Sequence, residues 1–440
     1  MIRIYEPAAY GPQGRCWWAD TVAGDHWPSI DGDMTADVAV IGGGYTGLSA
    51  ALHLAEGGAS VALLEAEHPG WGASGRNGGF CCLGGAKASD TALRKRFGAD
   101  GLARWKTTKI DAIRTVEALI DRFGIQVDRH SVGETLLAHA PRAWRQMQAD
   151  ARQIADKTQG YGVSPQLIGR DALRDHGLGG DWYGALTIPL GFALNPRKYH
   201  AGLAQAALRA GARLFAGSPA TAVLPERAGW RVVTPTGGVL AGRVVVATNG
   251  YSSEDIPDWL RGRYLPAQSS VIVTRPLSEG EQAAQGWTSA QMAYDSRRLL
   301  HYFRLMPDGR FLFGMRGGLR ATPRAQAAIS HKIRADFARL FPAWADVEIT
   351  HEWSGLVCLM PELRPFVGPV PDHPGLFAAL GYHGNGVAMG SHAGKLVAAT
   401  VLGRNDVPAV MAAPPGRFPL GRFRRALLRP AYWLAEAFDL

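Results

Sequence analysis

The chain has 440 residues, of which 47% are hydrophobic and 19% are charged. This length allows two or three packed domains, and the composition argues against both a largely disordered chain and a membrane-spanning bundle. The first residues lack a basic segment followed by an apolar one, so we expect no export signal and a cytoplasmic location.

The net charge of +9 raises the question of nucleic acid or membrane partners. Most arginines are dispersed, so we expect no nucleic acid partner. The one cluster, in the C-terminal tail, consists of Arg417, Arg422, Arg424, Arg425 and Arg429, alternating with Phe418, Phe423, Leu427 and Trp433. We interpret residues 413–440 as an amphipathic tail that docks on its own protein, with contact to a membrane surface as the less favoured alternative.

The number and spacing of the cysteines indicate that they are reduced thiols. Cys16, Cys81, Cys82 and Cys358 are too few for a disulfide framework, and no pair has the C-x-x-C spacing of a metal or redox site. We therefore expect no metal site, and we interpret the adjacent Cys81 and Cys82 as ordinary packed residues in preference to a redox pair.

The first strong pattern begins near residue 37. Residues 38–41 predict a short apolar strand, residues 42–44 a glycine turn, and residues 48–56 an Ala- and Leu-rich helix. Residues 61–65 predict a second strand. Together they form a compact β-α-β unit.

Further elements follow in chain order. Residues 264–313 contain β-branched and aromatic runs typical of a mostly antiparallel sheet. The remaining pattern predicts helices at 91–123, 141–158, 196–210 and 387–402, strands at 212–215, 230–234, 243–248 and 376–380, and a glycine loop at 381–386.

The expected fold class is α/β combined with α+β, in which a Rossmann-like nucleotide-binding domain is interleaved with a substrate domain built on a mostly antiparallel sheet. The nucleotide domain is assigned to residues 1–90, 190–255 and 365–412. The substrate domain is assigned to residues 91–189 and 256–364.

A dinucleotide fingerprint lies between the first strand and helix. Gly42 permits the tight turn, Gly44 allows the backbone to approach a pyrophosphate, and Gly47 lets the helix pack closely on the sheet. Glu65 follows 23 residues after Gly42, where its carboxylate can accept hydrogen bonds from ribose hydroxyls. The alternative reading, a glycine-rich turn and a surface glutamate, is disfavoured by this context.

A second glycine-rich segment, residues 70–80, separates FAD from NAD. Five of its residues are glycine, and they surround Ser74, Arg76 and Asn77. Such a backbone can wrap around a pyrophosphate and reach toward a flavin ring, whereas a plain NAD domain has no use for it. A mobile surface loop is the alternative.

Two later segments fit the same cofactor. Thr248, Asn249 and Gly250 end a buried strand. In the glycine loop before the last predicted helix, backbone amides and the positive helix end can face the negative charge that a reduced flavin develops.

These segments resemble the D-amino-acid oxidase superfamily of FAD-dependent oxidoreductases, and most of all its γ-glutamylputrescine oxidoreductase branch. Four segments carry the resemblance: DVAVIGGGYTGLSAALHLAE (37–56), GWGASGRNGGF (70–80), VVVATNGY (244–251) and GYHGNGVAMGSHAGKLVAA (381–399). It implies hydride removal from the carbon beside an amine, hydrolysis of the resulting imine, and reoxidation of the flavin by oxygen or another acceptor. The residues expected to bind FAD are Gly42, Gly44, Tyr45, Thr46, Gly47, Glu65, Gly72, Ala73, Ser74, Gly75, Arg76, Asn77, Gly78, Gly79, Val223, Thr248, Asn249, Gly250, Arg364, Gly381, Gly384, Asn385, Gly386 and Val387.

The chain departs from the family pattern at two positions. Where sarcosine-oxidase relatives carry the cysteine that bonds the flavin, this sequence has Gly355, and Cys358 is three residues away, so we expect non-covalent FAD. Ala388 replaces a carboxylate-binding lysine of those relatives, which argues against a small α-amino acid held by a lysine.

The predicted catalytic residues are His383, Tyr302 and Arg304. Tyr302 and Arg304 alternate on a strand and share one face, either toward the cavity or toward solvent. We favour Arg304 as an anchor for the far end of the substrate. For His383, the alternative to a catalytic role is a structural role in the packed interior. Phe80 and Trp353 are further candidates for the cavity wall, and the alternative for both is ordinary core packing.

The leading hypothesis is an FAD-dependent oxidoreductase that oxidises the carbon–nitrogen bond of an amine or amino acid, with a γ-glutamylputrescine-like amine as one candidate substrate. The alternatives are an NAD-dependent dehydrogenase and a flavoprotein whose FAD is not catalytic. The first of these leaves residues 70–80 and 381–386 without a purpose.

Overall fold

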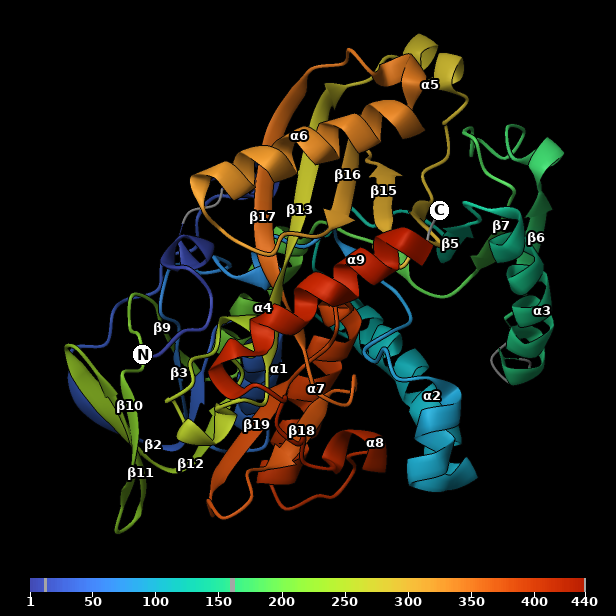
Figure 1. The fold of residues 1–440 in the computed structure, drawn as a ribbon. Helices are drawn as coiled ribbons and strands as arrows, with labels where there is room; N and C mark the ends of the chain where they lie inside the picture. Colours follow the sequence, from blue (N-terminus) through green and yellow to red (C-terminus); the bar gives the residue numbers. More distant parts are fainter. Residues whose placement is uncertain (12–13, 159–162, 439–440) are drawn as a thin grey trace.

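The computed structural model describes residues 1–11, 14–158 and 163–438. Two large sheets lie one above the other in Figure 1, with helices on their outer faces. The last two residues of the predicted tail lie outside the described residues. The predicted fold class, a Rossmann-like unit combined with a second, mostly antiparallel sheet, is confirmed.

The lower sheet contains the predicted β-α-β unit. β2 (Gly32–Ile41), β3 (Val61–Leu64) and β9 (Arg213–Phe215) are parallel neighbours, and β2 also pairs in parallel with β12 (Gly237–Val246). The N-terminal half of β12 forms an antiparallel meander with β11 (Gly229–Thr234) and β10 (Ala222–Glu226), and its C-terminal half pairs in parallel with β19 (Leu376–Leu380). β18 (Phe366–Pro369) pairs with β19. The carboxyl ends of the parallel strands therefore meet at one edge.

Four helices cover one face of this sheet. Their apolar residues, such as Leu48, Leu203 and Val397, share one core cluster with Val40 and Val245 of the strands. The helices are α1 (Tyr45–Glu56), α2 (Asp90–Phe123), α4 (Pro196–Arg209) and α7 (Gly386–Val401), with the short α8 (Ala409–Ala412) beside α2. Burial of both sheet faces explains the continuous apolar runs of β2 and β3.

The upper sheet has the strand order β1-β17-β13-β16-β15-β14-β5-β7-β6. Its strands are β1 (Gly14–Arg15), β17 (Ile349–Leu359), β13 (Leu265–Pro276), β16 (Arg310–Arg316), β15 (His301–Leu305), β14 (Met292–Asp295), β5 (Glu134–Leu137), β7 (Gly184–Ile188) and β6 (Gln166–Gly169). All neighbours are antiparallel except β14 and β5. A separate pair joins β4 (Phe80–Cys81) to β8 (Phe192–Ala193).

Helices α6 (Pro323–Leu340) and α5 (Glu279–Gln285) lie on the outer side of this sheet (Figure 1). Aromatic rings such as Phe303, Phe311 and Phe337 form a core cluster between α6 and the strands. α3 (Pro141–Thr158) lies beside β6 and β7. The other face of the upper sheet is directed toward the lower sheet, and the cavity described below lies on that side.

Residues 91–189 and 349–359 differ from expectation. The described part of residues 91–189 contains the strands β5, β6 and β7 besides the two predicted helices, and residues 349–359 form the long strand β17. The predicted domain boundaries stay predictions.

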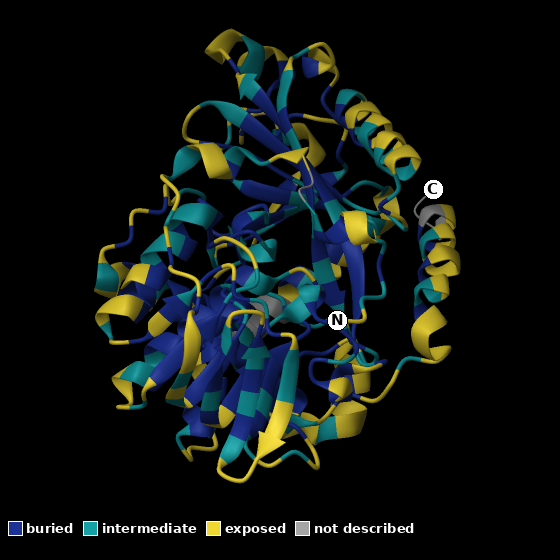
Figure 2. Cartoon of the chain, turned by 90° about the vertical axis from the view of Figure 1, so that its left-hand side faces the viewer, coloured by how far each residue is buried: buried dark blue, intermediate teal, exposed yellow. Residues whose placement is uncertain are grey.

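The C-terminal tail forms a short 3-10 segment, Gly421–Leu427, and α9 (Leu428–Phe438). Arg424 is buried and forms an ion pair with Glu254, whereas Trp433 is 67% exposed. Figure 2 shows mainly exposed residues on this helix. Within the described part of the chain, no helix combines the length and apolar character needed to cross a bilayer.

Candidate functional site

The first glycine turn follows β2 directly and lies close to the carboxyl end of β12. Gly42 has φ of 106°, which favours glycine, and a Cβ there would lie 2.9 Å from the carbonyl oxygen of Ala247. A Cβ on Gly44 would lie 2.8 Å from Ser74 Oγ, and one on Gly47 would collide with the carbonyl oxygen of Gly42. The turn therefore leaves an uncovered backbone at the start of α1, where helix N–H groups can bind a phosphate.

Glu65 follows β3 directly at the same edge. Its carboxylate accepts hydrogen bonds from the amides of Gly43 at 2.7 Å and Glu67 at 3.1 Å. Burial raises the pKa of the Glu65 carboxyl, while these amide hydrogen bonds oppose the shift. The fixed carboxylate retains further lone pairs, which suits it to bind ribose hydroxyls.

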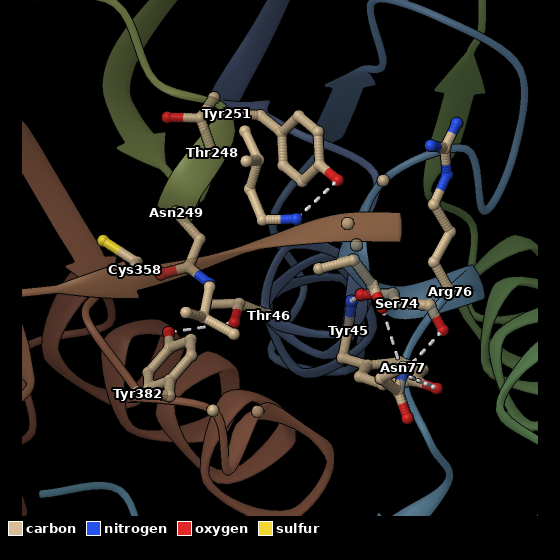
Figure 3. A pocket seen from close by; sticks show the side chains of 18 of the residues that line it. Tyr45, Thr46, Ser74, Arg76, Asn77, Thr248, Asn249, Tyr251, Cys358 and Tyr382 are labelled. Atoms are coloured by element: carbon tan, nitrogen blue, oxygen red, sulfur yellow. Dashed lines mark hydrogen bonds between the residues drawn. The ribbon is translucent and has the colours of Figure 1, made fainter. Parts of the chain in front are cut away.

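The second glycine-rich segment is held in place by surrounding side chains. Trp18 Nε1 donates to the Asn77 carbonyl and Trp353 Nε1 to the Arg76 carbonyl, each at 2.8 Å. Asn77 Nδ2 donates to the carbonyls of Ala73 and Ser74, both at 3.1 Å. Ser74 Oγ in turn accepts from the Tyr45 amide at 2.9 Å, which ties this segment to the first turn (Figure 3).

The two later segments lie together. Asn249 has φ of 46°, and its Oδ1 accepts from the Gly381 amide at 2.9 Å. Tyr382 OH shares a hydrogen bond of 2.9 Å with Thr46 Oγ1 of α1 (Figure 3). The segments around residues 42–47, 70–80, 248–250 and 381–387 therefore meet around one space, although they are far apart in the sequence.

One cavity runs along these segments and continues under the upper sheet. Nineteen residues on the sequence-based list line it: Gly42, Gly44, Tyr45, Thr46, Glu65, Gly72, Ala73, Ser74, Arg76, Asn77, Gly78, Thr248, Asn249, Gly384, Asn385, Gly386 and Val387 from the predicted FAD set, with Tyr302 and Phe80 from the predicted substrate set.

Five predicted glycines lie just behind the lining. They are Gly47, Gly75, Gly79, Gly250 and Gly381, and a Cβ on each would press on a neighbouring backbone or side chain. Their role in the structure is close packing of the segments that line the cavity.

Two residues predicted to contact FAD, Val223 and Arg364, do not line the cavity. Val223 lies on the β10–β11 hairpin, and Pro219 and Ala220 line the cavity before that hairpin begins. Arg364 is buried away from the cavity, where its guanidinium donates to the carbonyls of Val410, Ala413 and Pro414 at 3.1, 2.5 and 3.2 Å. It fixes the segment after α7.

His383 does not line the cavity either, so the predicted catalytic role is replaced by the structural alternative. It is fully buried, its Nδ1 donates to the Gly85 carbonyl at 3.1 Å, and its Nε2 accepts from the Met360 amide at 3.1 Å. Burial lowers the His383 pKa to about 4, which keeps the ring neutral.

Arg304 shares the inward face with Tyr302 but is covered. Its Nη2 donates to the Leu194 carbonyl at 2.8 Å, its Nη1 to His130 Nε2 at 3.2 Å, and its guanidinium lies 5.4 Å from the Trp18 ring. Because the side chain is fully buried behind the lining, the proposed substrate anchor is wrong for Arg304. Trp353 is likewise a core residue.

Tyr302 lines the cavity from β15. Its hydroxyl shares a hydrogen bond of 3.1 Å with Ser269 Oγ, and its ring contacts the edge of Phe80 at 5.7 Å between centroids. These residues form the apolar and hydroxyl-bearing wall that faces the glycine segments.

The ionisable lining residues that the sequence reasoning missed include Lys87, Glu134, Tyr294 and Arg316. Glu134 follows Gly133 at the start of the apolar strand β5, and Arg316 ends β16. A charged residue at either end of an apolar strand could have marked Glu134 and Arg316 as candidates. Without the strand order, however, the sequence did not show that these two residues line the same cavity.

The lining fits FAD. Two helix N-termini, at α1 and α7, open onto the cavity, and Glu65 lies where a ribose would be bound. Gly44 keeps the space beside Ser74 free of a side chain. Gly355 and Cys358 also line the cavity, and burial raises the pKa of the Cys358 thiol to about 12, so the thiol stays protonated.

Sequence comparison agrees with this geometry. The model of the DAO family, described as FAD-dependent oxidoreductase, matches residues 37–400. A probable oxidoreductase named OrdL of Rhizobium meliloti is 34% identical, over 94% of this chain and 95% of its own. The γ-glutamylputrescine oxidoreductase of Escherichia coli is 30% identical, over 90% of this chain and 91% of its own.

Solved structures show the same fold. Glycine oxidase from Geobacillus kaustophilus superposes with a TM-score of 0.70 and 21% identity, covering 86% of this chain and 98% of its own. Iminodiacetate oxidase from Chelativorans superposes with a TM-score of 0.67 and 22% identity, covering 86% and 100%. With this fold, this cradle and the match over residues 37–400, the chain belongs to the DAO family of FAD-dependent oxidoreductases.

Proposed function

We propose that the protein oxidises the carbon–nitrogen bond of an amine substrate. FAD, when bound, accepts a hydride from the carbon beside the nitrogen. Water then hydrolyses the imine to a carbonyl compound and free ammonia or amine, and oxygen or another acceptor takes the two electrons from the reduced cofactor. The NAD-dependent alternative is set aside because the family is FAD-dependent.

The observation that carries this proposal is the continuity of the cavity. Glycine segments of the lower sheet and side chains of the upper sheet, such as Tyr302 and Ser269, line the same space. A substrate bound under the upper sheet would therefore meet the cofactor directly. Phe80 and Tyr302 supply apolar surface that excludes water from the reacting atoms.

The substrate nitrogen must be neutral to supply its lone pair to the developing double bond. We therefore expect the limiting rate of flavin reduction to rise with pH until the bound amine is fully deprotonated.

The names of the relatives support an amine. They include a γ-glutamylputrescine oxidoreductase, a glycine oxidase and an iminodiacetate oxidase, and the first is the most similar in sequence of these three. We infer that a γ-glutamylputrescine-like primary amine is the best substrate among these types.

Product analysis tests the proposal. Purified holoenzyme is incubated in air with γ-glutamylputrescine, putrescine, glycine or iminodiacetate, and the aldehyde or oxoacid and the released ammonia or amine are quantified. We expect equal amounts of both products from at least one of the amines, with γ-glutamylputrescine the most active. A holoenzyme that forms no carbonyl product from any of the four would contradict the proposal.

A further inference from the structure

Lys87 and Arg316 are two of the four Lys and Arg side chains that line the cavity, and like Arg3 and Arg76 they form no ion pair with a carboxylate of the described residues. Arg316 donates through Nη2 to the His383 carbonyl at 3.1 Å. Lys87 is exposed and Arg316 is half-buried. A bound anion between Lys87 and Arg316 would stabilise both positive charges.

A carboxylate faces the same cavity. Glu134 is 2% exposed, its Oε1 accepts from the Leu83 amide at 3.0 Å, and its Oε2 accepts from Tyr294 OH at 2.7 Å. The positive charge of Lys109 acts on this carboxyl and opposes the effect of burial on its pKa. Burial raises the Glu134 pKa to about 7, so a bound cation would stabilise the ionised form.

Glu134 and Arg316 are hydrogen-bonded to two loops that are tied to each other. Asn385 Nδ2 donates to the Leu83 carbonyl at 3.1 Å, and His383 Nδ1 donates to the Gly85 carbonyl at 3.1 Å. Glu134 is hydrogen-bonded to Leu83 in the first loop, and Arg316 to His383 in the second. Glu134 and Arg316 therefore occupy fixed positions on one framework, yet they do not pair with each other.

We propose that this part of the cavity binds a zwitterionic α-amino-carboxylate head at the non-reacting end of the amine substrate, with the ammonium held by Glu134 and Tyr294 and the carboxylate by Arg316 and Lys87. The inference rests on the proposed amine oxidation and adds what selects the amine. A ligand that carries both charges satisfies all of these groups at once. A simple diamine leaves the two cations unbalanced.

The head is tested with four amides and amines that share one reacting end. γ-Glutamylputrescine has both head groups, glutarylputrescine lacks the α-amino group, γ-aminobutyryl-putrescine lacks the carboxylate, and putrescine lacks the head. Anaerobic flavin reduction at a pH of about 8 gives a half-saturation constant and a limiting rate for each. We expect removal of either head group to raise half-saturation about 10-fold or more, as for a charge-assisted hydrogen bond, with a smaller change in the limiting rate.

Two variants assign the charges. Glu134→Gln should raise the half-saturation constant of γ-glutamylputrescine about 10-fold or more. The constant of glutarylputrescine should change by less than about twofold, because that compound has no ammonium group for Glu134 to bind. Arg316→Gln should raise the half-saturation constants of γ-glutamylputrescine and glutarylputrescine and leave that of γ-aminobutyryl-putrescine nearly unchanged. Glu279→Gln on α5 and Arg320→Gln after β16 are the exposed controls, and they should leave the half-saturation of all four amines unchanged.

Binding is also measured without turnover. γ-Glutamylbutylamide has the head but no reacting amine, and we expect calorimetry to show it binding the oxidised holoenzyme and losing affinity in both cavity variants, whose flavin spectra report folding. Equal half-saturation for all four amines, or variants that weaken all of them equally, would overturn the head assignment while amine oxidation stands. Binding of the amide without reduction by any amine would overturn the proposed function and leave the head site standing.

Discussion

At the scale of single residues, His383 illustrates how burial decides between a catalytic and a structural histidine. The ring must carry its proton on Nδ1 to donate to Gly85, which leaves Nε2 free to accept from the Met360 amide. Protonation of Nε2 would remove that acceptor. Burial, the largest cause, lowers the pKa to about 4 from 6.5.

This shift predicts acid destabilisation. The unfolded chain takes up the proton near its ordinary pKa and the folded chain only near 4, so the stabilisation is complete above about 6.5 and is lost as the pH falls toward 4. The loss is at most about 1.4 kcal/mol per pH unit for each such group. Burial also lowers the pKa values of His130, His200 and His392.

Urea unfolding between pH values of about 7 and 5 measures the effect. His383→Gln, which can form both hydrogen bonds but does not titrate, should reduce the pH slope of the unfolding free energy by about one proton. An unchanged slope in a folded variant would show that His383 does not contribute to it.

Cys358 carries a separate residue-scale prediction. Its thiol lines the cavity and has a pKa raised to about 12 by burial, so it is a poor nucleophile toward a flavin. We expect acid precipitation of the holoenzyme to release all FAD into the supernatant. Flavin mass retained on the peptide that contains Cys358 would contradict non-covalent binding.

Residue type predicted the cofactor side better than the substrate side. Gly42, Gly44 and Glu65 belong to one short β-α-β unit, whose geometry follows from local sequence. Arg304 and Arg364 looked equally available, but their guanidiniums bind backbone carbonyls in the interior. Burial of a charged side chain depends on partners from distant segments, which a single sequence does not reveal.

At the scale of elements, the C-terminal tail is joined to the body by a buried ion pair. Arg424 donates through Nη1 and Nη2 to both carboxylate oxygens of Glu254, at 3.1 and 2.5 Å, and through Nε to the Tyr264 carbonyl at 2.7 Å. Arg425 lies beside it over the Tyr5 ring at 3.7 Å. The alternation of arginine and apolar residues in the sequence did not distinguish these inward arginines from exposed neighbours such as Arg422.

Removing one partner of this pair has a predictable cost. Arg424→Ala leaves the Glu254 carboxylate buried and uncompensated, so we expect a loss of about 3–5 kcal/mol in the free energy of unfolding. Arg422→Ala, in the same 3-10 segment but exposed, should change it by less than about 0.5 kcal/mol. Chemical denaturation compares the two, and equal effects would contradict a specific role for the buried pair.

At the scale of the whole molecule, the site depends on long-range strand pairing. β5 comes from the insertion after α2, and its parallel pairing with β14 attaches it to the hairpin of β15 and β16. This arrangement brings Glu134 into the cavity that Arg316 also lines. The periodicity of residues 91–189 favoured helices alone, because its strands are short, so sequence reasoning found neither the strand order nor this half of the site.

Anaerobic single-turnover reduction tests directly whether the protein transfers electrons from an amine to FAD. Oxidised holoenzyme is mixed with excess γ-glutamylputrescine without oxygen, and the flavin absorption is followed in time. The continuity of the cavity predicts complete, substrate-dependent bleaching, with one carbonyl product formed per FAD reduced. A fully loaded, folded holoenzyme whose flavin stays oxidised with this amine and with the other amines of the panel would contradict the account.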